Sequence, residues 1–217
     1  MRRAITVVLL SAVGLRAVEL DLDPRTVLDA IAIGQSSFDA DRLRFHAPYR
    51  VDVRQAPLDS VDVVTPFRRV VIAAELRARA GDRRFGQRDG LAIVDKYARQ
   101  ISVHAEFTFH PLNTLVLVPG YTVQWITRRG TRIDPAIVDR APRYFPRTGS
   151  GALPTPPGGG ATPPALPGRS QPMLGATVVA FFDGALLLKP EDPAGVVVIE
   201  EAGRELARLP IDLANVR

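Results

Sequence analysis

Apolar and polar residues alternate most regularly over residues 101–109. The odd-numbered positions carry Ile, Val, Ala, Phe and Phe, whereas the even-numbered positions carry Ser, His, Glu and Thr. Successive side chains of a β-strand point to opposite faces of the sheet. The pattern therefore predicts a strand with one apolar face against a core and one polar face.

Several other short segments are rich in the β-branched and aromatic residues that favour strands. The further predicted strands cover residues 43–53 (with Pro48 indicating an edge or a bend), 115–118, 121–127, 177–182, 185–188, 196–200 and 205–211. Asp183-Gly184 and Ala202-Gly203 stand between neighbouring runs and predict two hairpins. Most of these strands lie in the second half of the chain.

Two helices are predicted by an N-cap residue followed by proline, at Asp23-Pro24 and at Thr65-Pro66. Proline suits the first position of a helix, and a capping side chain accepts a hydrogen bond from a free backbone N–H. Gly34 and Gly81 mark the predicted ends of these helices.

The segment after Thr65-Pro66 also permits a strand over residues 69–74, because residues 70–72 are β-branched. The helix is favoured, since both of its ends carry stop signals and its apolar residues recur at helical spacing at Phe67, Val70, Val71, Ala74 and Ala78. A further helix is predicted over residues 89–98, and Asp134-Pro135 predicts one helical turn.

Residues 146–173 differ in kind from the rest of the chain. Eight of these 28 residues are proline and six are glycine. Such a segment has too little apolar surface to offset the entropy lost on ordering, so it is predicted to be a flexible loop. The 44 residues that follow are near the lower limit for an independent domain. We therefore expect residues 18–217 to form a single α+β domain containing this loop, with a mainly antiparallel sheet, two or three helices and a strand-rich C-terminal part.

The first 17 residues have the composition of a signal peptide. Two arginines follow Met1, and residues 4–15 are uncharged and mostly apolar. The apolar run is shorter than the ~20 residues that span a bilayer. We therefore expect export to the periplasm or the extracellular space, with cleavage near Ala17 and no transmembrane segment in the mature chain. A buried first strand of a cytosolic domain, over residues 5–10, is the alternative.

Composition narrows the classes of function. The chain has no cysteine, which excludes disulfides, thiolate metal sites and cysteine nucleophiles. The formal net charge of +5 becomes +2 when the three arginines of residues 1–17 are removed. The remaining basic residues are scattered among acidic ones, and a nucleic-acid footprint would gather them in a stripe. Nucleic acid is therefore not an expected partner.

His104, Glu106 and His110 form the one cluster with metal-binding potential. If the predicted strand continues to residue 110, all three side chains share its polar face. Imidazole and carboxylate groups suit zinc or iron, although a third ligand would have to come from His110 or His46. An alternating strand also needs polar residues on its solvent face, and the spacing matches no established metal motif. We therefore expect no metal and no other cofactor.

Other candidate sites are weaker. Residues 128–132 carry three arginines beside Trp125 and could touch an anionic polymer, but a charged hairpin tip is the favoured interpretation. Asp39, Asp41 and Asp62 are interpreted as turn or cap formers. The chain has no G-x-S-x-G, G-x-G-x-x-G or Walker motif, so no catalytic residue is assigned.

These features predict an exported, non-enzymatic binding or interaction protein of the cell envelope, whose partner is an unknown protein or envelope polymer. One alternative is an exported metal-dependent enzyme that uses His104, Glu106 and His110. The second alternative is a cytosolic, arginine-rich protein that binds nucleic acid.

Overall fold

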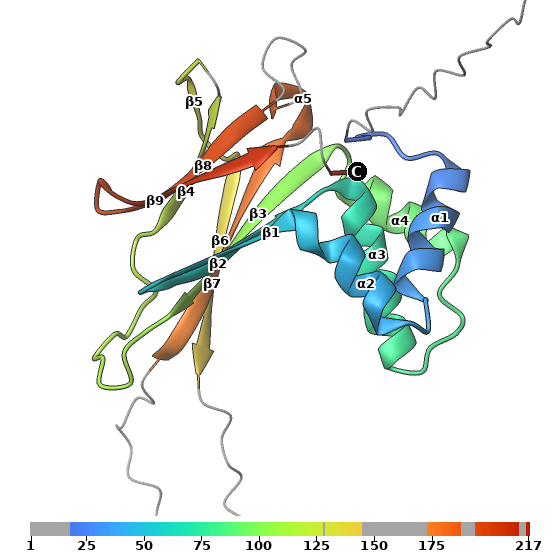
Figure 1. Cartoon of the computed structure of the whole chain (residues 1–217), viewed down its shortest axis with the longest axis horizontal. Helices are drawn as coiled ribbons and strands as arrows, with labels where there is room; N and C mark the ends of the chain where they lie inside the picture. The colour runs from blue at the N-terminus through green and yellow to red at the C-terminus, as the bar shows by residue number, and fades with distance from the viewer. Residues whose placement is uncertain (1–17, 128, 145–172, 188–193, 213–215) are drawn as a thin grey trace, which may run out of the picture.

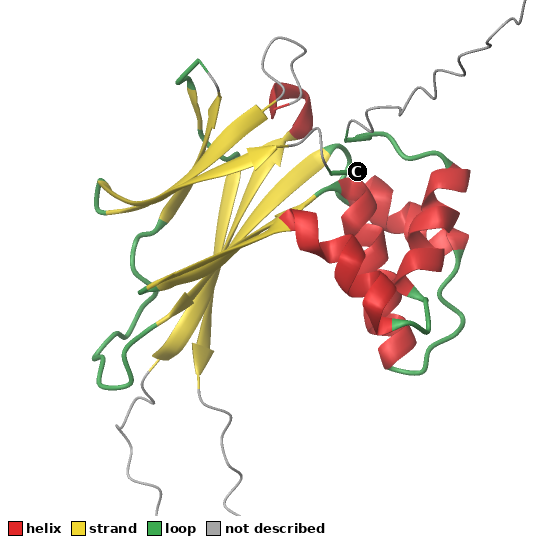
Figure 2. Cartoon of the chain, viewed as in Figure 1, coloured by secondary structure: helices red, strands yellow, loops and turns green. Residues whose placement is uncertain are grey.

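The computed structural model describes residues 18–127, 129–144, 173–187, 194–212 and 216–217. The predicted signal segment and almost all of the Pro/Gly-rich segment lie outside these residues. Helices precede and flank two antiparallel sheets, and strands dominate the C-terminal half (Figure 1, Figure 2). The predicted α+β class is confirmed.

More helices are present in the described residues than the two or three expected. They are α1 (Pro24–Gly34), α2 (Asp39–His46), α3 (Pro66–Arg79), α4 (Gln87–Lys96) and the single turn α5 (Gly184–Leu187), with the 3-10 turn η1 (Ala47–Tyr49) after α2. None of the helices in this part of the chain has the length and apolar character needed to cross a membrane.

The strands form one five-stranded and one four-stranded sheet. The first sheet has the order β1-β2-β3-β7-β6, and the second has the order β5-β4-β8-β9. The strands are β1 (Arg50–Gln55), β2 (Leu58–Val64), β3 (Gln100–Thr108), β4 (Thr122–Thr127), β5 (Arg132–Ile133), β6 (Ile137–Tyr144), β7 (Met173–Asp183), β8 (Ala194–Glu201) and β9 (Arg204–Asp212). Strands β7 and β8 follow the Pro/Gly-rich segment and pair with strands that precede it.

The Pro/Gly-rich segment connects two neighbouring strands. Strand β6 pairs antiparallel with β7, and their register brings Tyr144 opposite Met173. Strand β7 in turn pairs with β3 along its length, from Gln100 opposite Asp183 to Thr108 opposite Gly175. The polypeptide therefore leaves the sheet and returns to it at adjacent positions.

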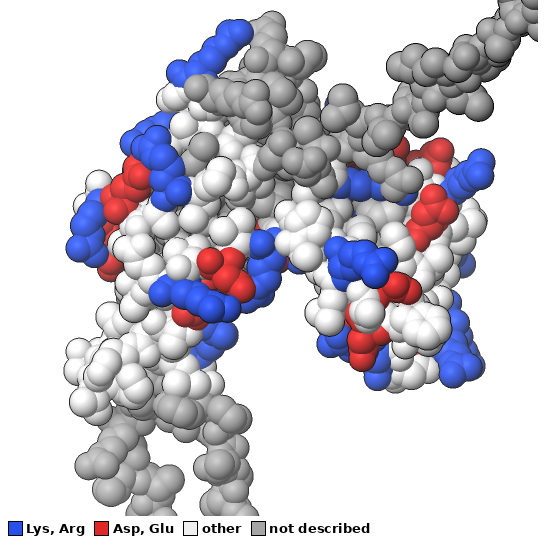
Figure 3. Space-filling view, in the orientation of Figure 1, with Lys and Arg blue, Asp and Glu red and all other residues white. Residues whose placement is uncertain are grey.

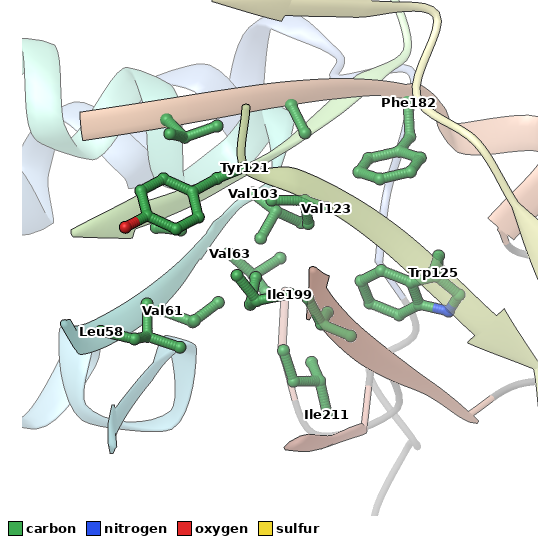
Figure 4. Close-up of a cluster of buried hydrophobic side chains, with 14 of the residues drawn as sticks. Leu58, Val61, Val63, Val103, Tyr121, Val123, Trp125, Phe182, Ile199 and Ile211 are labelled. Carbon is green, nitrogen blue, oxygen red and sulfur yellow. The ribbon is translucent and has the colours of Figure 1, made fainter. Parts of the chain in front are cut away.

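The main hydrophobic core lies between the two sheets (Figure 4). Trp125 of β4 meets Phe182 of β7 edge to face, with ring centroids 6.3 Å apart. Phe107 of β3 stacks on Tyr121 at 4.0 Å. The alternation over residues 101–109 accordingly places Ile101, Val103, Ala105 and Phe107 in this core, which confirms the predicted buried face of the strand.

The helices pack around a second hydrophobic cluster on the other side of the five-stranded sheet (Figure 1). Its buried members include Val27 and Ile31 of α1 together with Phe67, Val70 and Val71 of α3. Both predicted N-caps are present, since Asp23 Oδ1 accepts a hydrogen bond from Thr26 N–H at 2.6 Å and Thr65 Oγ1 accepts one from Arg68 N–H at 3.2 Å. The helix is thus confirmed over residues 69–74, and the strand alternative is wrong.

Four local predictions are wrong. Residues 43–46 belong to α2, which has acidic residues in its first turn and basic residues in its last, an arrangement that complements the helix dipole. Residues 115–118 form no strand. Gly184 begins the helical turn α5 where a hairpin was expected, and the predicted turn at Asp134-Pro135 is coil that leads into the unpredicted strand β6. The exposed side chains of β6 include charged residues and Pro142, which are typical of an edge strand. They do not alternate with buried apolar residues, so the sequence shows no strand pattern here.

Candidate functional site

A pocket of about 590 Å³ lies between the helices and the outer face of the five-stranded sheet. We call it the α3–sheet pocket. Its apolar lining residues are Val64, Ile72, Ala73, Leu76, Ile93, Val179 and Phe181, and its polar lining residues are Asp62, Arg68, Arg69, Lys96, Tyr97, Ser102, His104 and Asp139. Its size is within the range of small-molecule sites, which occur preferentially between packed units of a protein.

The roof of the pocket is a second stripe along α3. Arg69, Ile72, Ala73 and Leu76 follow the i, i+3, i+4, i+7 spacing of one helix face. The first stripe of α3, which includes Val70 and Val71, is buried in the helical cluster. Helix α3 therefore presents apolar side chains both to the helical cluster and to the pocket.

The floor of the pocket is the outer face of β3 and β7. Ser102 and His104 alternate with the residues of β3 that face the core between the sheets, and Val179 and Phe181 do the same on β7. The register pairs Ser102 with Phe181 and His104 with Val179. Cross-strand neighbours on one face lie within contact distance, so polar and apolar floor residues stand side by side.

Arg68 is committed to holding the helices on the sheet. Its side chain is buried and donates hydrogen bonds to Asp62 Oδ1 at 2.8 Å, to the Val63 carbonyl at 2.6 Å and to His46 Nδ1 at 3.2 Å. Asp62, predicted to be a turn or cap former, instead lies within β2 and forms this ion pair. The charge of Arg68 is thus compensated within the protein.

Arg69, the next residue, has a different environment. Its guanidinium donates to Ser102 Oγ at 3.0 Å and to the Gln100 carbonyl at 3.4 Å, and it lies over the Tyr97 ring at 4.3 Å. It forms no ion pair with any residue that the structure describes. Burial lowers the pKa of Arg69 to about 10, so the side chain still carries its positive charge at neutral pH. The pocket therefore contains a desolvated cation without a carboxylate partner.

His104 is uncharged at neutral pH. Burial, followed by repulsion from Arg69, lowers its pKa to about 4. Its Nε2 lies 3.1 Å from Ser102 Oγ, which accepts a hydrogen bond from Arg69. The Ser102 hydroxyl can donate its hydrogen to Nε2, an arrangement that keeps the proton of the neutral imidazole on Nδ1.

The contact between Ser102 and His104 does not form an activated nucleophile. A histidine with a pKa near 4 is a weak general base at neutral pH. Ser102 is fully buried, and its oxygen already accepts from Arg69. The neighbouring carboxylate of Asp62 is bound by Arg68 and Arg50, and no hydrogen bond joins it to His104 in the described part of the chain. The geometry fits ligand binding better than acyl transfer.

The three predicted metal candidates occupy separate environments. His104 lies in the pocket, whereas the Glu106 carboxylate accepts from the Thr177 hydroxyl at 2.9 Å and pairs with Arg143 at 3.7 Å. Strand β3 ends at Thr108, so His110 lies beyond it in an exposed turn, where its Nδ1 accepts from Leu112 N–H. Within the described ranges, no group of three His, Asp or Glu side chains has a geometry suited to a metal ion.

On the rest of the surface, several charged side chains pair with other side chains of the protein. Arg132, from the predicted charged hairpin tip, binds Gln124 and Glu200 at 2.9 and 2.8 Å, and Arg128 lies outside the described residues. On the face shown in Figure 3, basic and acidic side chains are interspersed. A second hollow of about 730 Å³ contains Arg77 and Asp82, which pair with each other at 3.5 Å. Arg84 also lines this hollow, but its side chain is exposed, whereas Arg69 is desolvated by burial.

Sequence reasoning identified His104 but missed Arg69 and the α3 stripe. The stripe is present in the sequence as Arg69, Ile72, Ala73 and Leu76, but the adjacent core stripe of α3 obscured it. Comparison with known proteins adds no assignment, because no family model matches the sequence and no curated protein or solved structure is significantly similar to it.

Proposed function

We propose that this chain is an exported, non-enzymatic binding protein that holds a small ligand in the α3–sheet pocket. The observation that carries the proposal is the second apolar stripe of α3. Leu76, at the outer end of this stripe, is 62% exposed, and Ile72 is partly exposed over the pocket. A surface helix that buries one stripe in a core normally presents polar residues elsewhere. Apolar side chains around a hollow are instead typical of a ligand site.

Export is proposed from the N-terminal sequence alone. Mass spectrometry of the protein from its native host tests it. A mature chain that begins near residue 18 is the expected result, and soluble protein that retains Met1 or Arg2 would contradict export without affecting the binding proposal.

The pocket is tested by binding of N-phenyl-1-naphthylamine, an uncharged apolar fluorophore. The purified protein is expected to bind it saturably, with enhanced fluorescence. Replacing Ile72 with Trp fills the pocket and should weaken binding by about tenfold or more, since each 1.4 kcal/mol of lost contact is a factor of ten. Leu28→Trp is the matched control, because Leu28 is a half-exposed aliphatic residue on α1 that does not line the pocket.

Two results would contradict the binding site. One is the absence of saturable binding to the wild-type protein. The other is equal binding by wild type, Ile72→Trp and Leu28→Trp, which would place the fluorophore elsewhere, for example on the exposed side chains of Leu112, Val116 and Leu117.

A further inference from the structure

We infer that the ligand of the α3–sheet pocket is a small organic acid, with its carboxylate held at Arg69 and an apolar body lying along α3 towards Leu76. This inference rests on the proposed binding function and specifies the chemistry of the ligand. It is carried by the hydrogen-bonding capacity of Arg69, the charge balance of the pocket and the direction of the α3 stripe.

Arg69 has N–H groups that are not used in hydrogen bonds to the described residues. A guanidinium carries five N–H groups, and the described residues accept from it only at Ser102 Oγ and the Gln100 carbonyl. The Tyr97 ring covers one face of the guanidinium plane and leaves its edges available to an acceptor. Arginine binds planar carboxylates through two parallel N–H···O bonds, which are stronger when they are charge-assisted and partly desolvated.

The charges that line the pocket leave a single positive excess. Its cations are Arg68, Arg69 and Lys96, and its carboxylates are Asp62 and Asp139. Arg68 and Asp62 neutralise each other at 2.8 Å. His104 adds no charge at neutral pH, for the reasons given above. One excess charge matches a carboxylate better than a phosphate monoester, which carries about −1.5 to −2 at pH 7.

The apolar part of the pocket extends from Arg69 in one direction. Leu76 lies seven positions further along α3, which corresponds to about 10 Å at 1.5 Å per residue. Ile72 and Ala73 lie between them on the helix, and Ile93 of α4 and Phe181 of β7 also line the pocket. A ligand with a charged head and an apolar chain of this length would therefore bury its chain while its head meets the guanidinium.

The experiment is titration calorimetry at neutral pH with octanoate, 1-octanol, octylamine and octyl phosphate. These probes share an apolar chain and differ in the charge of the head. Octanoate is expected to bind wild-type protein at least about tenfold more tightly than 1-octanol, because a hydrogen-bonded charge pair of this kind is worth that factor or more. Octyl phosphate should bind more weakly than octanoate, and octylamine the most weakly of the four.

Arg69→Gln should abolish the preference for octanoate over 1-octanol, and binding of 1-octanol to this variant shows that the pocket persists. Arg69→Lys should retain part of the preference, since lysine keeps the positive charge but cannot form a bidentate pair with a carboxylate. Arg77→Gln is the matched control, because Arg77 lies on the same helix, is 62% exposed in its side chain and pairs with Asp82 outside the pocket. This variant should behave as wild type.

The outcomes separate the two proposals. If 1-octanol or octylamine binds wild-type protein as tightly as octanoate, or if Arg69→Gln keeps the preference, the inference is overturned and the binding pocket stands. Tighter binding of octyl phosphate than of octanoate would overturn the carboxylate in favour of a phosphate. If neither these four probes nor N-phenyl-1-naphthylamine binds to the wild-type protein, the proposed binding function itself is wrong.

Discussion

Arg68 and Arg69 are consecutive and chemically identical, yet the structure gives them different roles. Neighbouring helix positions point about 100° apart, because an α-helix has 3.6 residues per turn. Arg68 therefore reaches β2 and pairs with Asp62, whereas Arg69 reaches Ser102 of β3 and the pocket. The sequence shows two adjacent cations, and the difference between them depends on partners supplied by distant strands.

His104 is expected to make folding stability depend on pH. Its pKa is lowered from 6.5 to about 4, so the unfolded chain binds more protons than the folded protein between these values. Stability should be highest above pH 6.5 and should fall as the pH drops towards 4, by on the order of 3 kcal/mol for this residue. His46, whose pKa is also lowered by burial, contributes in the same direction.

Urea unfolding at pH 7 and at pH 4.5 measures this effect. His104→Gln should lose less stability than wild type between the two pH values, since glutamine does not titrate. The matched control is His110→Gln, because His110 is an exposed histidine outside the pocket. Equal losses in wild type and His104→Gln would show that protonation of His104 does not limit the stability.

At the level of single elements, several predictions with a strong local signal succeeded, although the hairpin at Asp183-Gly184 did not form. The N-caps located the starts of α1 and α3, the alternation located β3, and Ala202-Gly203 located the hairpin of β8 and β9. Two of the missed elements have weak local signals. Helix α2 has no buried residue, and the side chains of β6 are mostly exposed. Such elements form because neighbouring parts of the fold provide hydrogen-bond partners, and a periodic pattern does not reveal them.

Strand β8 should be sensitive to substitution at Gly195. A Cβ atom at this position would lie 1.5 Å from Nε1 of Trp125, which is buried between the sheets. Gly195→Ala therefore requires the indole or the strand to move, and we expect it to destabilise the protein by about 1–3 kcal/mol. Thermal denaturation should show a decrease of several degrees, at about 2–4 °C per kcal/mol for a chain of this size.

Gly120→Ala serves as the control for the same change in size, because no atom lies within 4 Å of its added Cβ. It should leave the melting temperature within about a degree, as surface substitutions usually do. Combining Gly195→Ala with Trp125→Phe should cost less than the sum of the two single changes if the indole is the obstacle. Strict additivity would contradict this explanation.

At the level of the whole molecule, three layers succeed one another: the four-stranded sheet, the five-stranded sheet and the helices (Figure 1). The sheets share one core, the helices have another, and the α3–sheet pocket lies between the second and third layers. Strand β7 separates β3 from β6 in the five-stranded sheet. The C-terminal part therefore supplies both a central strand and half of the pocket floor.

Truncation after Pro146 should yield an insoluble or unfolded product. It would remove β7, β8 and β9 and expose the apolar faces of β3 and β4, which bury Phe107 and Trp125 in the intact protein. Deleting residues 148–168 should leave the melting temperature nearly unchanged, because Tyr144 and Met173 are paired and a short hairpin loop can join them. Expression of both variants followed by thermal melts tests this, and a soluble 18–146 fragment with a wild-type transition would show that the tail is a separate module.

The sequence was sufficient for the features that depend on a few neighbouring residues: the helix caps, the alternation of β3, the β8–β9 hairpin and the α+β class. The pocket required the tertiary structure. Its polar contacts join residues such as Arg69 and Ser102, which are 33 positions apart, and its floor depends on the pairing of β3 with β7 across the Pro/Gly-rich segment. Helix and strand propensities depend on residues that are close in the sequence. The desolvation of Arg69 and the low pKa of His104 arise instead from packing between segments that are distant in the sequence. The pattern of residues along the chain does not show how those segments pack.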